Sequence, residues 1–335
     1  MPRRESASPR RPLRDEAAFV AWLRNVADAG IGDDTAFLSL DGSFAWTVDT
    51  QHEGVHLPTG CDPAVAARRL LAVNLSDLAA VGAEPRYALL SLAAPPEYDR
   101  RRFVAALVAA CARFRVRLLG GDTSRLDRLS ATLTLIGRRP RRASWMRRSA
   151  ARPGDQLFVG GTLGEAALGL ALVRAGAIWE RGRMVLPAGL EGPRSHTVAA
   201  RRAVRRFLAP EPQMELSRRL SQSGCRVAAI DVSDGLGKDL ARLCAASGVG
   251  AEVETLPLAQ AAEELAARLG LNARELALGG GEDYVLLFTL PASSRQPAGS
   301  TPIGWIRSGT GVWAIEEGDR RRDIADAGFD HFAAR

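Results

Sequence analysis

Carboxylates beside glycine or small polar residues recur along this chain, and they are the side chains best suited to chemistry. Six stretches share this character: Gly32-Asp33-Asp34, Val48-Asp49-Thr50, Asn74-Leu75-Ser76-Asp77, Gly120-Gly121-Asp122-Thr123, Asp231-Val232-Ser233-Asp234-Gly235 and Gly279-Gly280-Gly281-Glu282-Asp283-Tyr284. Most of them follow or lie within apolar runs, so we expect the carboxylates at strand ends. Carboxylates that converge in a chain of net charge +7 need a cation. Several Mg²⁺ ions holding a polyphosphate would supply it.

Phosphate groups also need hydrogen-bond donors. Glycine-rich backbone at Gly120-Gly121 and Gly160-Gly161, and the helix expected after Ser233, can present N–H groups to an anion. Arg148 can clamp a phosphate from the basic stretch in which it lies. The chain contains no P-loop and no protein-kinase signature motifs. A nucleotide site is therefore expected to depend on metal ions and acidic loops.

No catalytic residue is predicted, because no Ser-His-Asp or Cys-His arrangement is visible in the local spacing. Such an absence suits an acceptor that is already an anion. A phosphate monoester has a second pKa of about 6, so its oxygen is ionised at neutral pH without a general base. The pattern favours transfer from ATP to a phosphate acceptor, by positioning and charge neutralisation.

Each motif has a purely structural alternative. Gly121-Asp122-Thr123 is also a turn sequence, Ser233-Asp234-Gly235 is also a helix cap, and Asp77 can end a helical turn. Arg148 can be a solvated charge in a basic run. The motifs together leave more carboxylates at the ends of apolar elements than turns alone require.

Hydrophobic periodicity predicts the elements that must position these residues. The expected helices cover 15–29, 63–80, 99–114, 164–174, 215–223, 236–247 and 263–269; the expected strands cover 37–40, 44–48, 87–93, 116–119, 129–136, 156–159, 227–230, 251–253 and 284–290. The first two strands form a hairpin through Asp41-Gly42. The helix over 63–80 is apolar nearly all round, which predicts burial, and it ends near Gly82.

At 335 residues the chain exceeds the usual size of a single core, so two domains are expected. Residues 1–14 are rich in Arg and Pro without an apolar segment and are interpreted as a disordered leader. The basic stretch 137–151 marks a boundary between a domain over 15–140 and a second domain over 141–335. Two halves that both contribute acidic loops predict a site at their junction.

Composition argues against several classes of protein. No run of about 18 apolar residues is present, so no membrane span is expected. The pI is near 10, but the arginines are scattered and Lys238 is the single lysine, which argues against nucleic-acid binding. The four cysteines are far apart, as is typical of reduced thiols in a cytoplasmic protein. His52 and His56 have i, i+4 spacing without a helical context, so zinc is not expected there.

In these motifs the sequence resembles the thiamine-monophosphate kinase family, which belongs with aminoimidazole ribotide synthetase and selenophosphate synthetase in one ATP-binding superfamily. The segments that carry the resemblance are 31–34, 48–57, 72–80, 120–123, 148–155, 230–236, 280–284 and 328–332. They occur in the same order and extend from about residue 30 to the end. Lys238, where the family has a small residue, departs from the pattern but removes no proposed ligand.

The resemblance implies a fold, a reaction and a set of site residues. The fold is the two-domain α/β (α+β) fold of aminoimidazole ribotide synthetase, with an N-terminal mixed-sheet domain that dimerises through its sheet and a C-terminal α/β domain that closes over the site. The reaction is ATP plus thiamine monophosphate giving ADP plus thiamine diphosphate, with several Mg²⁺ ions, in a homodimer. By this resemblance the metal ligands are Asp33, Thr47, Asp49, Asp77, Asp122, Asp231 and Asp234; the nucleotide contacts are Gly121, Asp122, Arg148 and Ser233; and the thiamine contacts are His56, Glu282 and Phe329.

Three alternatives stay open at this point. A hydrogenase-maturation or selenophosphate-type enzyme is disfavoured, because the chain ends in Ala333-Ala334-Arg335 and its first cysteine is Cys61. A non-catalytic ATP or Mg²⁺ sensor predicts nucleotide binding without turnover. A nucleic-acid-binding protein predicts salt-dependent affinity for any duplex.

Overall fold

The computed structural model describes residues 36–40, 42–180, 183–186 and 193–330. The leader at 1–14, the helix expected over 15–29, and Asp33 lie outside these residues. Residues 34–329 form one compact unit that contains two large sheets and their helices. The boundary near residue 140 falls between the two sheets along the chain and stays a prediction.

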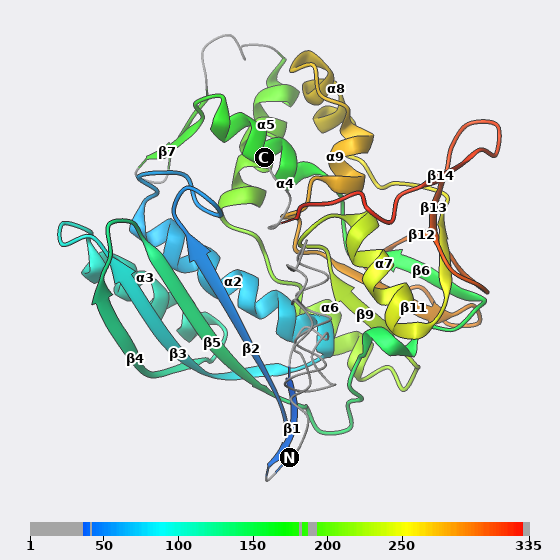
Figure 1. The fold of residues 1–335 in the computed structure, drawn as a ribbon, viewed down its shortest axis with the longest axis horizontal. Helices are drawn as coiled ribbons and strands as arrows, with labels where there is room; N and C mark the ends of the chain where they lie inside the picture. The colour runs from blue at the N-terminus through cyan, green and yellow to red at the C-terminus, as the bar shows by residue number, and fades with distance from the viewer. Residues whose placement is uncertain (1–35, 41, 181–182, 187–192, 331–335) are drawn as a thin grey trace, which may run out of the picture. The chain divides into compact units, whose positions relative to one another are not determined.

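The first half of the chain forms a mixed five-stranded sheet in the order β1-β2-β5-β3-β4, with two helices on one face (Figure 1). Its elements are β1 (Ala36–Leu40), β2 (Gly42–His52), α2 (Pro63–Val81), β3 (Glu84–Ala94), α3 (Arg100–Arg113), β4 (Arg117–Arg125) and β5 (Ser130–Arg138). β1 and β2 pair antiparallel, as expected of the hairpin, and β3 and β4 pair in parallel. The predicted mixed sheet is confirmed.

The second half forms a seven-stranded sheet in the order β14-β13-β10-β12-β6-β11-β9, together with a separate two-stranded sheet. Its elements are η1 (Arg148–Ala150), β6 (Asp155–Val159), α4 (Glu165–Arg174), β7 (Ile178–Glu180), β8 (Arg183–Val185), α5 (Arg194–Leu208), α6 (Met214–Ser221), β9 (Ala228–Asp231), α7 (Leu236–Ser247), β10 (Gly250–Val253), α8 (Gln260–Arg268), α9 (Ala273–Gly279), β11 (Leu286–Pro291), β12 (Thr301–Arg307), β13 (Val312–Ile315) and β14 (Arg321–Asp323). The sheet is again mixed, since β10 and β13 are parallel while β6 lies antiparallel to β11.

Helix α2 has the burial that its apolar sequence predicts. The Asp62 side chain accepts the N–H of Ala64, Pro63 opens the first turn, and Gly82 ends the helix in the left-handed conformation. Most residues between these caps are buried. α2 packs on β2 and β5 of its own sheet and also contacts β9, β11 and α6 of the second half. Side chains on this helix therefore lie against elements of both halves.

Several sequence predictions differ from the structure. Gly121-Asp122-Thr123 lies inside β4 and is not a turn, because β4 continues through the glycines to Arg125. The arginine-rich stretch before residue 201 contains β7, β8 and the start of α5, whose apolar face is buried. The elements of this arginine-rich stretch were not expected, because the many arginines concealed its hydrophobic periodicity.

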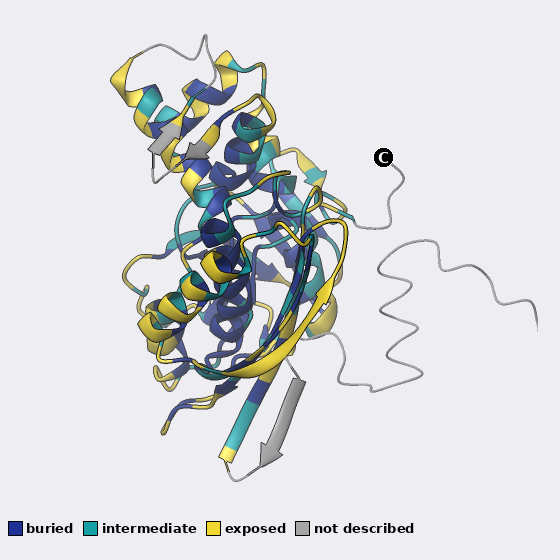
Figure 2. Cartoon of the chain, turned by 90° about the vertical axis from the view of Figure 1, so that its left-hand side faces the viewer, coloured by how far each residue is buried: buried dark blue, intermediate teal, exposed yellow. Residues whose placement is uncertain are grey.

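Burial distinguishes the two faces of the first sheet along β5, where buried residues alternate with half-buried ones. Leu133 and Leu135 on β5 are fully buried under α2 and α3. β4 is exposed along almost its whole length and is drawn mostly in yellow in Figure 2. In the part of the chain that the structure describes, no helix is both long and apolar enough to cross a bilayer.

Candidate active site

The loop between β9 and α7 gathers several of the predicted site residues. Asp231 is the last residue of β9 and is buried, and Ser233-Asp234-Gly235 leads into α7. The carbonyl oxygen of Ser233 accepts the N–H of Glu282 at 2.7 Å, and that of Asp234 accepts the N–H of Phe329 at 2.8 Å. Backbone pairing thus brings two predicted thiamine contacts beside a predicted nucleotide contact and a predicted metal ligand.

This loop is held by a side chain that the sequence analysis missed. Gly235 is the N-cap of α7 and provides no side-chain cap, contrary to the cap interpretation of Ser233-Asp234-Gly235. Asp239, one turn into α7, accepts the backbone N–H groups of Ser233, Asp234 and Gly235 at 3.0, 2.9 and 3.3 Å through its Oδ2 atom. Arg242 donates to Asp239 Oδ1 at 2.8 Å and lies 2.5 Å from Asp234 Oδ2. Burial, then repulsion from Asp234, raises the pKa of Asp239 to about 7.

The glycine-rich segment before β11 is strained. Glu282 and Tyr284 have φ of +66° and +49°, a region that side chains with a Cβ rarely occupy. The N–H of Tyr284 donates to the carbonyl of Val232 at 2.8 Å, so the strained segment is bound directly to the β9–α7 loop. Strain of this kind persists only where surrounding contacts over-determine the backbone, and it is common at functional sites.

The side chains of Glu282 and Asp283 point to different elements. Glu282 forms an ion pair with Arg69 of α2. Asp283 accepts the N–H groups of Gly164 at 2.7 Å and Ala166 at 3.1 Å, at the start of α4. Consecutive residues therefore connect the strained segment to both halves of the chain.

Two predicted ligands meet between β2 and α2. Thr47 on β2 donates its hydroxyl proton to the Asp77 carboxylate on α2. Asp49 follows on the same strand and, together with Asp231, contributes to raising the pKa of Tyr284, after burial and Glu282. Asp49 and Asp231 therefore act electrostatically on one hydroxyl group from different sheets. The strand-end expectation is correct for Asp231 but wrong for Asp49 and Asp122, which lie within β2 and β4, whereas Asp77 lies in the helix that was expected over 63–80.

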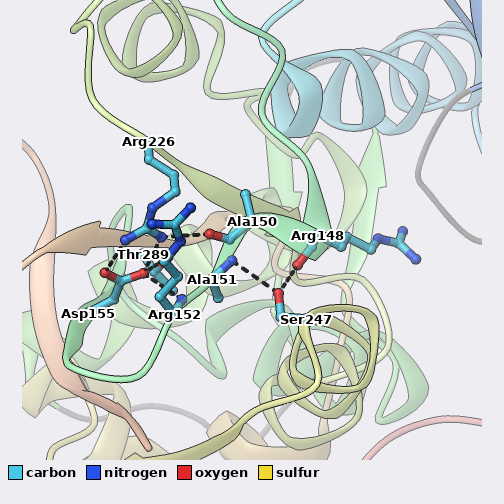
Figure 3. Close-up of polar contacts among 8 residues, drawn as sticks. All are labelled: Arg148, Ala150, Ala151, Arg152, Asp155, Arg226, Ser247 and Thr289. Carbon is cyan, nitrogen blue, oxygen red and sulfur yellow. Dashed lines mark hydrogen bonds and ion pairs between the residues drawn. The ribbon is translucent and has the colours of Figure 1, made fainter.

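Arg148 lies in η1, whose backbone is anchored on both sides (Figure 3). Ser247 at the end of α7 donates to the Arg148 carbonyl at 2.6 Å and accepts the N–H of Ala151 at 3.0 Å. Arg226 donates to the Ala150 carbonyl at 2.6 Å and pairs with both carboxylate oxygens of Asp155, at 2.7 and 2.8 Å. The Arg148 guanidinium points away from these contacts (Figure 3), and its charge acts on the pKa of Asp239.

Gly121 has a structural requirement of its own. Its φ is +153°, and a Cβ at this position would lie 1.6 Å from the carbonyl oxygen of Leu90 on the neighbouring strand. Glycine is therefore required here by backbone packing, whatever ligand the strand binds. Asp122, the next residue, is exposed on β4.

His56 lies in the turn that follows β2. Its Nδ1 atom accepts the backbone N–H of His52 at 3.1 Å. His56 thus lies beside the end of β2, whereas Glu282 and Phe329 are both hydrogen-bonded to the β9–α7 loop. Lys238, the departure from the family pattern, donates to the Phe329 carbonyl at 2.5 Å and so supports the C-terminal segment.

The acidic residues fit a metal that a nucleotide would share with the protein. Among the described residues, which exclude Asp33, no three Asp, Glu, His or Cys side chains are grouped to hold a metal ion by themselves. Among the candidate ligands, Thr47 and Asp77 are hydrogen-bonded to each other, and Asp231 and Asp234 lie three residues apart where β9 leads into α7, with oxygen donors throughout. Mg²⁺ commonly binds through one or two carboxylates plus phosphate oxygens and waters rather than in an all-protein cage.

The local sequence offers a signal for two of the residues that were missed. Arg69 is a charged residue inside an otherwise apolar helix, and such a residue requires a partner once the helix is buried. Asp239 lies in the first turn of α7, where a carboxylate is favoured. The contacts of Arg69 with a segment more than 200 residues away could not be deduced from spacing.

Comparison with known proteins shows similarity to AIR synthase related proteins and, within them, to thiamine-monophosphate kinases. Residues 32–138 match the family model of AIR synthase related protein, N-terminal domain. The thiamine-monophosphate kinase of Salmonella typhimurium is 37% identical over 273 residues, which cover 80% of this chain and 78% of that protein. A solved structure of AaThiL complexed with AMPPCP and TMP superposes with a TM-score of 0.83 at 29% identity, over 97% of this chain and all of that one. The chain belongs to the thiamine-monophosphate kinase family.

The hydrogenase-maturation alternative is supported by the fold alone. A solved structure of hydrogenase maturation protein HypE superposes with a TM-score of 0.64 over 87% of this chain and 91% of that one. Its sequence identity is 18%, which is too low to transfer an activity.

Burial of Asp283 gives a pH prediction. Burial raises its pKa from 3.8 to about 7, against the two backbone hydrogen bonds. Between those values the folded chain keeps a proton that the unfolded chain releases, so this group's contribution to the free energy of unfolding falls as the pH rises. We expect the wild type to lose stability relative to Asp283→Asn between pH 4.5 and 7.5, by at most about 4 kcal/mol.

Urea unfolding followed by circular dichroism at both pH values measures this difference. Taking the difference between the two proteins removes the contribution of every other titrating group to the pH dependence of the free energy of unfolding. Parallel pH profiles for the wild type and Asp283→Asn would show that Asp283 titrates normally.

Proposed function

We propose that this chain transfers the γ-phosphoryl group of ATP to thiamine monophosphate, giving ADP and thiamine diphosphate. The observation that carries the proposal is membership of the thiamine-monophosphate kinase family across four fifths of the chain. Every residue that the resemblance assigns to the site is present in the sequence. We further propose that the reaction takes place in the cytoplasm, which suits the four free thiols.

The described geometry suits a transfer without a general base. Asp239 and Asp283 are two carboxyls whose pKa is raised to about 7, the range in which a base is useful. Both accept backbone hydrogen bonds and are buried, so neither is placed to receive a proton from a substrate. An ionised phosphate acceptor has no proton to give up.

Mg²⁺, when bound, would neutralise the charge that builds up on the transferred phosphoryl group. The residues proposed to hold it are Asp33, Thr47, Asp49, Asp77, Asp122, Asp231 and Asp234. Gly121, Asp122, Arg148 and Ser233 are proposed to bind the nucleotide. His56, Glu282 and Phe329 are proposed to bind the thiamine moiety, with the half-exposed ring of Phe329 stacking on a heterocycle.

Phosphoryl transfer from labelled ATP tests the proposal directly. Thiamine monophosphate and free thiamine are offered in parallel with Mg²⁺. We expect label in thiamine diphosphate from the monophosphate and no transfer to free thiamine, because an alcohol, unlike an ionised phosphate, needs a base to take its proton, and the proposal includes none. Bound ATP without transfer to either acceptor would favour the non-catalytic sensor, and equal transfer to both would contradict the base-free site.

Substitution of Asp77 tests the metal assignment. Asp77→Asn keeps the size of the side chain and an acceptor for Thr47 but removes a charge, so we expect kcat to fall at least 100-fold, roughly 3 kcal/mol in the activation barrier, with little change in melting temperature. Glu211→Asn, at an exposed ion pair with Arg205, is the control and should retain activity. Near-wild-type kcat in Asp77→Asn would exclude Asp77 as a ligand.

We also propose that two copies of the chain associate through the open face of the first sheet. Trp46, Val48, Leu89 and Leu119 project from β2, β3 and β4 with exposed fractions of 37%, 61%, 44% and 53%. Large apolar side chains gathered on one face are common at protein interfaces. β4 is also an edge strand, whose unpaired backbone groups favour association with another chain.

The interface prediction is tested by placing charges on this face. Val48→Asp with Leu89→Asp should convert a dimer into a monomer in sedimentation equilibrium, because each buried carboxylate would be unpaired. Val108→Asp, at an equally exposed apolar residue on α3, should leave the dimer intact. A wild type that sediments as a monomer at all concentrations would exclude the interface.

A further inference from the structure

Arg69 has no exposed surface, which is unusual for an arginine. It lies on α2, two turns before Asp77, in a helix that is otherwise mostly apolar. A guanidinium removed from water is stable only if its donors and its charge are satisfied. The groups that satisfy Arg69 therefore indicate what this residue holds in place.

Those groups come from separate segments of the chain. Nε donates to the side-chain oxygen of Gln51 on β2 at 3.0 Å. One terminal nitrogen donates to the backbone carbonyl of Phe207 at the end of α5, and the other forms the ion pair with Glu282. The guanidinium carbon lies 4.8 Å from the centre of the Phe207 ring and 5.7 Å from that of Tyr284. A single side chain thus joins β2, α2, α5 and the strained segment before β11.

Charge makes the contact with Glu282 different from the other contacts. Gln51 and Phe207 are neutral, so Glu282 is the carboxylate with which this buried cation forms its ion pair. Burial lowers the pKa of Arg69, but attraction to Glu282 and Tyr284 outweighs burial and raises it. Arg69 is therefore charged, and loss of Glu282 would leave that charge buried and unpaired.

The ion pair with Arg69 engages only one of the two carboxylate oxygens of Glu282. Its Oε2 atom receives the Arg69 hydrogen bond, while Oε1 has no partner among the residues that the structure describes. About a fifth of the side chain, 21%, is exposed. One carboxylate oxygen is thus fixed by the protein, and the other remains available to a ligand at the proposed thiamine subsite.

We infer that Arg69 is a positioning residue for the thiamine subsite: it holds the Glu282 carboxylate, on its strained backbone, in the orientation that the substrate meets. Arg69 itself is buried and touches no substrate. The inference rests on the proposed function, because Glu282 is a proposed thiamine contact. It adds a buried residue of α2 to a subsite assigned to His56, Glu282 and Phe329.

Kinetics of single and double variants test the inference. Arg69→Met keeps most of the length of the side chain but removes its donors, and we expect the KM for thiamine monophosphate to rise at least tenfold while the KM for ATP stays within twofold. Arg69→Lys keeps the charge and one donor, so it should recover most of the loss. Arg307→Met removes an ion pair with Glu252 between β12 and β10 and should change neither KM.

Comparing the effect of Arg69→Met in the wild type with its effect in the Glu282→Gln variant shows whether Arg69 acts through Glu282. In Glu282→Gln, the further change Arg69→Met should leave the KM for thiamine monophosphate unchanged, because the carboxylate that Arg69 orients is already gone. The double variant should also melt at a higher temperature than Glu282→Gln alone, since it contains no unpaired buried charge.

Several outcomes would overturn the inference. Equal increases in both KM values in Arg69→Met would indicate a general structural role, as would a rise in KM that is the same with and without Glu282. If Arg69→Met does not fold, Arg69→Gln, which keeps donors but removes the charge, takes its place; it must show the selective rise in KM for thiamine monophosphate, and an unchanged KM would contradict the inference. A wild type that binds ATP but phosphorylates no thiamine monophosphate would instead refute the proposed function, and the inference with it.

Discussion

A helix that is apolar on every side is stable in water only when other elements cover it completely, and the arrangement of this protein depends on that requirement. α2 satisfies it by lying against β2 and β5 on one side and against β9, β11 and α6 on another. Polar residues on α2 consequently lie where the two halves of the chain meet. Asp77 reaches Thr47 of the first sheet, and Arg69 reaches Glu282 of the second half.

The second constraint is a set of backbone hydrogen bonds that joins the β9–α7 loop to the segment before β11 and to the C-terminal segment. Residues 232–234 accept backbone hydrogen bonds from residues 282, 284 and 329. Asp239 fixes the first segment from within α7, while Arg69 and Asp283 fix the second from α2 and toward α4. The unfavourable φ angles of Glu282 and Tyr284 are thus maintained by contacts from three directions.

Much of the fold could be predicted because its signals are local. The burial of α2 follows from its continuous apolar sequence, and its end follows from Gly82. The hairpin of β1 and β2 follows from Asp41-Gly42 between two strand-like runs. α5 was missed because arginines at 201, 202, 205 and 206 alternate with the apolar residues that it buries, so net polarity concealed the helical period.

The site was predictable in part, for the same physical reason. Asp231 and Ser233 are recognisable because they end a buried strand and precede a helix. The role of Asp239 was not visible, because a carboxylate in the first turn of a helix usually interacts with the helix N-terminus and not with the loop before it. Arg69 and Glu282 are separated by more than 200 residues, and no local rule connects two such positions.

The hydrogen bonds from residues 233–235 to Asp239 affect the thermodynamics of ligand binding. Three consecutive N–H groups are fixed by one buried carboxylate that belongs to the protein itself. Ordering a flexible loop around a ligand typically reduces the net affinity by the conformational entropy that the loop loses. Here that entropy is lost once, when the chain folds, so this loop is already rigid whenever a ligand arrives.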